Sequence, residues 1–134
     1  MSYEQKLEHF REIFEQHNNE RKSRLYPNLP LDMVQIETGY KFDKVFVNNG
    51  TQRLGHYMVE SRTGAIYGIK SWTQVNRRRQ YGTLDTVDQY DWSDFYARPL
   101  PGSEAEMEHV KREEEIKAGQ KKRGRKRKAT QLSN

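Results

Sequence analysis

The residues best suited to chemistry are a run of cations near the end of this 134-residue chain. Seven lysine and arginine residues lie within eight positions: Lys121, Lys122, Arg123, Arg125, Lys126, Arg127 and Lys128. A segment with this charge cannot form a core, but it can neutralise several phosphates, and each contact releases counterions and weakens binding at high salt. The run therefore predicts sequence-independent contacts with DNA or RNA. The alternative is a solubilising tail that touches nucleic acid only weakly.

This cationic run resembles two kinds of known sequence motif. Arg123-Gly124-Arg125 is similar to the core of an AT-hook, an extended segment that enters the narrow A·T minor groove, although Lys126 stands where that core continues with proline. The whole run also resembles a nuclear localisation signal, which implies a nuclear protein if the host is eukaryotic.

A second cationic feature lies in the middle of the chain. Residues 72–81 interleave aromatic rings with cations: Trp72, Arg77, Arg78, Arg79 and Tyr81. Single-stranded nucleic acid is held by such sets, because bases stack on rings while guanidinium groups follow the backbone, and Tyr57 and Tyr67 would extend the platform. The competing interpretation is that these rings form the core of a small sheet and the arginines an exposed loop.

A third feature is an acidic stripe in which aspartates recur every three residues, at Asp85, Asp88, Asp91 and Asp94. Carboxylate oxygens at this spacing could gather a divalent cation. Neutralisation by nearby arginines or by the basic tail relieves their repulsion more simply, so we expect a solvated acidic face and no metal.

Catalysis is not indicated by any remaining pattern. The chain has no cysteine, and its four histidines are scattered without ligand spacing or an evident nucleophile. A glycine-rich phosphate loop between a strand and a helix is also missing. We therefore predict a protein that is not an enzyme and has no cofactor.

The N-terminal segment carries a different kind of candidate site. Tyr3, Leu7, Phe10 and Phe14 recur at helical spacing, which predicts an amphipathic helix over residues 3–22, capped by Ser2. Its apolar seam could lie on the chain's own core, on a protein partner or on a second copy. A virion structural or interaction module that assembles through this seam is the competing function, and an inhibitor of a host protein is a third.

Short β-branched and aromatic runs follow the prolines at 27 and 30. They predict strands over 41–47, 55–60 and 65–72, with turns at 48–50 and 61–64, and a fourth strand over 80–84 after a basic loop at 76–79. Residues 85–96 are expected to form a short helix or ordered loop that folds back over the sheet. The fold class predicted is α+β, with an N-terminal helix, a three- to four-stranded antiparallel meander and a charged helical or disordered C-terminal extension.

Charge divides the chain into segments. The net charge is +5 and the mean hydropathy is −1.17, with 33% apolar residues. We expect a helix and linker over 1–30, a sheet domain over 31–100, an acidic, partly helical connector over 101–118 and a disordered basic tail over 119–134. With no apolar run of membrane-spanning length and no signal-peptide core, an intracellular protein without a membrane partner is predicted.

Within the sheet domain, three stretches resemble small proteins encoded in tailed-phage genomes: the sequence YMVESRTGAIYGIKSW over residues 57–72, RQYGTLD over 79–85, and Asp91-Trp92. The resemblance covers residues 56–97. It implies a phage origin and a compact domain, located in the host cytoplasm or the virion, without assigning an activity. The placement of charge and the composition, independently of this resemblance, predict a small non-enzymatic protein that binds DNA or RNA.

Overall fold

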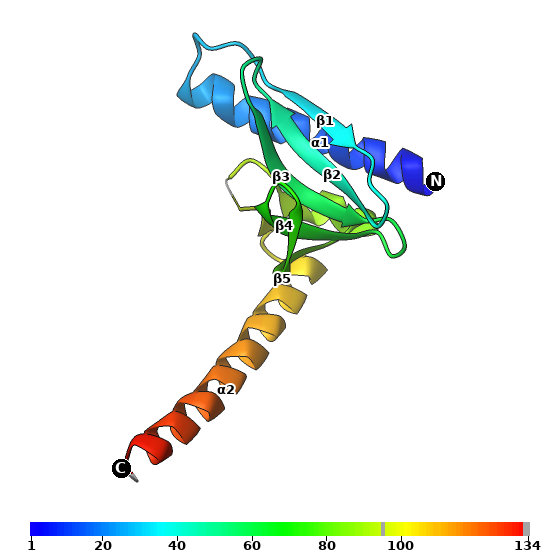
Figure 1. Ribbon diagram of the computed structural model, residues 1–134. Coiled ribbons are helices and arrows are strands. Elements are labelled where there is room, and N and C mark those ends of the chain that lie inside the picture. Colours follow the sequence, from blue (N-terminus) through cyan, green and yellow to red (C-terminus); the bar gives the residue numbers. More distant parts are fainter. Residues whose placement is uncertain (95, 133–134) are drawn as a thin grey trace. The chain divides into compact units, whose positions relative to one another are not determined.

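The computed structural model of this protein describes residues 1–94 and 96–132, with side chains described as far as residue 119 (Figure 1). The chain divides into two compact units, residues 1–98 and residues 99–134. The first unit holds an N-terminal helix and a five-stranded antiparallel sheet, which confirms the predicted α+β class with one strand more than expected.

Helix α1 (Tyr3–Leu25) begins at the predicted cap and runs three residues beyond the predicted end. The Ser2 hydroxyl accepts the Gln5 backbone N–H at 3.2 Å, and the Gln5 side chain accepts the Ser2 N–H at 2.9 Å. This reciprocal pair is a capping box, which satisfies two backbone donors that a helix start otherwise leaves open.

The sheet is a simple meander in which each strand pairs with the next along the chain. Its strands are β1 (Met33–Glu37), β2 (Phe42–Asn48), β3 (Arg53–Glu60), β4 (Ala65–Ser71) and β5 (Gln74–Thr83), in that order. The turns at 48–50 and 61–64 are confirmed, since Gly50 and Gly64 have φ of 94° and 75°, a region that favours glycine. Strand β1 was not predicted, and β5 includes the residues expected to form a basic loop.

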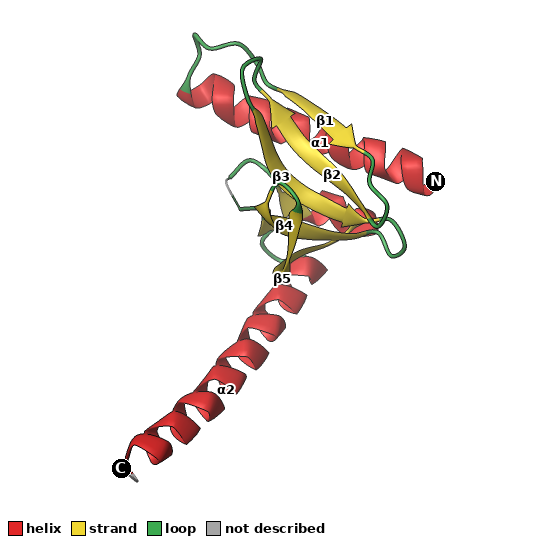
Figure 2. Cartoon of the chain, in the orientation of Figure 1, coloured by secondary structure: helices red, strands yellow, loops and turns green. Residues whose placement is uncertain are grey.

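Two segments complete the fold of the first unit and lead out of it. The 3₁₀-helix η1 (Leu84–Gln89) confirms the short helix expected after the sheet, and Thr83 caps it. Strands β6 (Tyr90–Asp91) and β7 (Arg98–Pro99) form a separate two-stranded sheet. Figure 2 shows α1 and η1 behind the five-stranded sheet in that view.

One face of the sheet packs on α1 around a cluster of aromatic rings. Trp92 and Phe10 are fully buried, and their ring centroids are 4.6 Å apart. Tyr57 lies between them and the sheet, 5.2 Å from Trp92 and 5.7 Å from Phe10. The Trp92 indole N–H donates to the Val87 carbonyl at 3.0 Å, so its one polar atom is satisfied inside the core.

The helix seam predicted as a partner interface is part of this core instead. Leu7, Phe10 and Phe14 are between 0% and 6% exposed. The Tyr3 hydroxyl donates to the buried Asp43 carboxylate at 2.7 Å, and burial together with Asp43 raises the Tyr3 pKa. A periodic apolar stripe does not say which surface covers it; in this chain the sheet does, so assembly through these four residues is not supported.

The second unit contains helix α2 (Glu104–Leu132). The Ser103 hydroxyl accepts the Glu106 N–H at 3.1 Å, as expected for a cap. The helix continues beyond the predicted connector into the segment expected to be disordered, where lysine, arginine, alanine and glutamine have good helix propensity. Side chains from residue 120 onward lie outside the part of the chain that the structure describes.

Candidate nucleic-acid interface

The sheet face turned away from α1 carries alternating rings and cations. Side chains of a strand alternate between faces, so Asp43 and Val45 point toward α1 while Lys44 and Phe46 point to the other side. We call this second surface the cation–aromatic face, and define it by Phe42, Lys44, Phe46, Arg53, Tyr67, Trp72 and Arg77. Within the described residues of 1–98, no helix lies over it (Figures 1 and 2).

Trp72 is the centre of this face. The Lys44 ammonium lies 3.9 Å from the Trp72 ring centroid, and the Arg53 guanidinium lies 4.9 Å from it and 4.5 Å from the Phe46 ring. Such contacts are attractive because the ring face is electronegative. Gly55 permits this packing, since an added Cβ would lie 2.8 Å from the Ile69 side chain and 3.5 Å from Trp72.

A carboxylate joins the two cations. Glu37 accepts from Lys44 and from Arg53, each at 3.3 Å. The hydrogen bond from Lys44, supported by Arg53, lowers the pKa of Glu37, so this carboxylate stays charged at neutral pH. One negative charge between two positive ones leaves this part of the face cationic.

The arginine run occupies an irregular part of β5. Gly68 pairs with Asn76 and the preceding Tyr67 pairs with Gln80, so Arg77, Arg78 and Arg79 form a bulge on the edge strand. The three side chains then separate. Arg77 joins the cation–aromatic face, with its guanidinium 5.3 Å from Phe42 and 5.5 Å from Tyr67, and lies 3.8 Å from Glu60.

The other two arginines have different surroundings. Arg79 stacks on Tyr96, 4.0 Å from the ring centroid, on the side where Tyr81 is buried. Arg78 is exposed, and among the described side chains it has no ionic or aromatic partner. The structure therefore places Trp72 and Arg77 on the same face, each against different neighbours, and leaves Arg78 exposed on the edge strand.

The predicted platform was partly wrong about its aromatic residues. Tyr67 does lie on the cation–aromatic face, but Tyr57 and Tyr81 belong to the opposite core, where they are 1% and 8% exposed. The sequence interpretation also missed Phe42, Lys44, Phe46 and Arg53. Lys44 and Phe46 lie in β2, where Val45, Phe46 and Val47 are consecutive apolar residues, so the sequence shows no alternation that would separate the two faces.

A hollow of about 350 Å³ is lined in part by Phe42 and Lys44 of the cation–aromatic face. Residues 37–41, at and beyond the end of β1, also line it, as do Thr73 and Val75 near the β4–β5 turn. Its walls include the apolar Met58 together with the Lys44 side chain.

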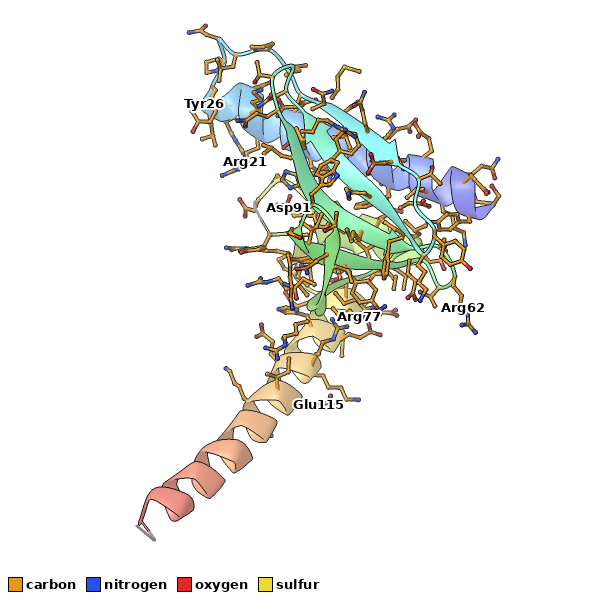
Figure 3. The ribbon with its side chains drawn as sticks, viewed as in Figure 1. Arg21, Tyr26, Arg62, Arg77, Asp91 and Glu115 are labelled. Carbon is orange, nitrogen blue, oxygen red and sulfur yellow. The ribbon has the colours of Figure 1, made fainter. Side chains whose placement is uncertain are left out.

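Charge is distributed unevenly over the first unit. Residues 42–83 carry seven lysines and arginines against two acids; the cations are Lys44, Arg53, Arg62, Lys70, Arg77, Arg78 and Arg79. Helix α1 has five of each sign. Figure 3 shows Arg62 and Arg77 far from Arg21 and Tyr26, which lie near the end of α1.

The acidic stripe has a structural partner. Asp85 pairs with Lys6 at 2.7 Å, Asp88 with His9 at 3.6 Å, Asp91 with His17 at 3.9 Å and Asp94 with Arg21 at 3.7 Å. Lys6 and Arg21 therefore neutralise the two ends of the stripe and help to hold the segment after β5 against α1, whereas His9 and His17 carry charge only if protonated. Among the described residues, no three histidine or acidic side chains are grouped closely enough to hold a metal ion.

The hydrogen bonds that hold the Asp91 carboxylate predict a loss of stability in acid. The Ser93 hydroxyl donates to Asp91 at 2.6 Å and lowers the Asp91 pKa, with smaller contributions from His17 and Arg24. A lowered carboxyl pKa stabilises the fold above the ordinary value of about 4, and the stabilisation is lost as pH falls through the folded-state value. Urea unfolding between pH 7 and 3 should show this decline, and both Asp91→Asn and Ser93→Ala should make it shallower. An unchanged pH profile in both variants would contradict this role of Asp91.

The basic tail residues 121–128 lie outside the described side chains, so the phosphate contacts assigned to them stay a prediction. No described helix is long and apolar enough to span a membrane.

No protein-family model, curated protein or solved structure shows significant similarity to the chain. The resemblance to tailed-phage proteins therefore stays a prediction.

Proposed function

We propose that this chain is a non-enzymatic protein that binds single-stranded nucleic acid on its cation–aromatic face, with the basic tail adding affinity for phosphates. The observation that carries the proposal is the grouping of Phe42, Tyr67 and Trp72 with Lys44, Arg53 and Arg77 on one sheet surface. Rings and cations side by side suit an unpaired strand, because bases stack on rings and phosphates follow the cations.

Electrostatics support the same partner. The sheet segment has an excess of positive charge, whereas Asp85 and Asp94, at the two ends of the acidic stripe, pair with Lys6 and Arg21 of α1. These two ion pairs reduce the repulsion that the stripe would exert on a polyanion bound to the sheet. A cationic patch also raises the rate at which a charged partner associates, and this rate falls as salt rises.

Arg77 provides the sharpest test, because it is the cation of the bulge that lies on the cation–aromatic face and its side chain is exposed. Arg77→Ala should weaken binding of a labelled 20-nucleotide single strand roughly five-fold at low salt, and lower the slope of log affinity against log salt by about 0.7. Fluorescence anisotropy across a salt series measures both quantities.

Arg21→Ala is the matched control, since it removes the same charge from the end of α1, away from the proposed interface (Figure 3). It should change affinity by much less than Arg77→Ala. Equal losses in the two variants would show that net charge alone determines binding, and would contradict an interface on the sheet.

A further inference from the structure

The hollow beside the cation–aromatic face has walls of mixed chemistry. Met58 and Val75 are apolar, whereas Lys44 supplies a donor and Glu37 an acceptor. Ligand sites in proteins combine an apolar surface with a few placed polar groups in this way. At about 350 Å³ the hollow lies near the lower end of such sites, so it suits a single small unit of a larger ligand.

The polar groups of the hollow match the edge of a nucleobase. Lys44 has an ammonium with three donors, and its described partners are one Glu37 oxygen and the Trp72 ring face. Base edges present acceptors beside donors, so an ammonium and a carboxylate 3.3 Å apart can meet both kinds of group. A phosphate fits this hollow poorly because Glu37 would repel it.

Tyr40 is an aromatic residue beside the hollow. It lines the hollow, and yet 97% of its surface is exposed. Its ring therefore adds almost nothing to the folded core and is free to stack on a bound group. Lys41 is the next residue and is also exposed, so a cation lies where the backbone of a bound strand would pass.

We propose that this hollow is a base-binding subsite, which takes one unstacked base of a single-stranded nucleic acid with Tyr40 stacked on it. The inference rests on the proposed function and assigns it a specific place. It accounts for a tyrosine that is 97% exposed beside a hollow of mixed chemistry, because the packing of the core does not require this ring.

The test compares two single strands with the same number of phosphates. One is a 12-nucleotide oligothymidylate, and the other is a fully abasic 12-unit strand. The unmodified full chain should bind the thymidylate more tightly, since each stacked base contributes substantially to affinity. Tyr40→Ala should weaken thymidylate binding about five-fold or more and leave abasic binding unchanged, whereas Tyr40→Phe should retain the preference.

Tyr26→Ala is the matched control, because Tyr26 is an exposed tyrosine that follows α1, at the other end of β1 from Tyr40 (Figures 1 and 3). It should bind both strands like the unmodified chain. If Tyr40→Ala retains the full preference for bases, or weakens both strands equally, the subsite is wrong while nucleic-acid binding stands. If the unmodified chain binds neither strand at low salt, the proposed function itself fails.

Discussion

Trp92→Ala is expected to lower the free energy of unfolding by about 3–5 kcal/mol, the range for truncating a large buried aromatic residue. Trp92 is fully buried, and its ring lies 4.6 Å from Phe10 and 5.2 Å from Tyr57. Alanine would leave a cavity between α1 and the sheet, and would leave the Val87 carbonyl without its indole donor. Urea unfolding followed by far-ultraviolet circular dichroism measures the change.

Trp72→Ala is the control for this prediction. Trp72 is only partly buried, and it packs on the opposite face against Phe46 and Lys44. Its removal should cost clearly less stability than removal of Trp92. A loss below about 1 kcal/mol for Trp92→Ala would contradict the description of Trp92 as a fully buried member of the aromatic core.

Replacing the seven tail cations with glutamine is expected to have the largest effect on binding. The positions are Lys121, Lys122, Arg123, Arg125, Lys126, Arg127 and Lys128. If each contacts one phosphate of a single strand, the slope of log affinity against log salt should fall by up to about 5, and affinity at low salt by roughly a hundred-fold or more. Anisotropy with a labelled 20-nucleotide single strand measures both values.

The control removes negative charges instead of positive ones, from the acidic part of helix α2. Changing Glu113, Glu114 and Glu115 to glutamine removes three negative charges without touching the tail. This variant should bind at least as tightly as the unmodified chain. An unchanged salt slope after loss of the seven cations would mean that the tail does not contact phosphates.

The turns allowed the central strands to be predicted from the sequence. Asn49 and Gly50 form a tight turn in which the Asn49 side chain accepts the Thr51 and Gln52 N–H groups, and Gly64 closes the next turn. Strand β1 has no such signal, since it is five residues long and follows a proline-containing linker. The arginines of β5 were assigned to a loop because a run of charge does not distinguish a loop from a bulged edge strand.

The residues of the candidate site were harder to predict from the sequence than the strands, because the site forms where segments distant in the sequence pack together. Trp72 and Arg77 could be selected from their local pattern, but Lys44 and Arg53 become relevant only when β2 and β3 pair beneath Trp72. The partner of the acidic stripe was missed for the same reason. Lys6 and Arg21 are 15 residues apart, whereas their partners Asp85 and Asp94 are nine apart, so no common spacing in the sequence reveals the pairing.

The most direct measurement of the central claim is the salt dependence with which the unmodified full chain binds a labelled single-stranded oligonucleotide. We predict saturable binding at low salt that weakens steeply as salt rises, because cations of the sheet and the tail displace counterions from several phosphates. An absence of binding at low salt, or an affinity that does not change with salt, would contradict the claim that this protein binds nucleic acid through these cations.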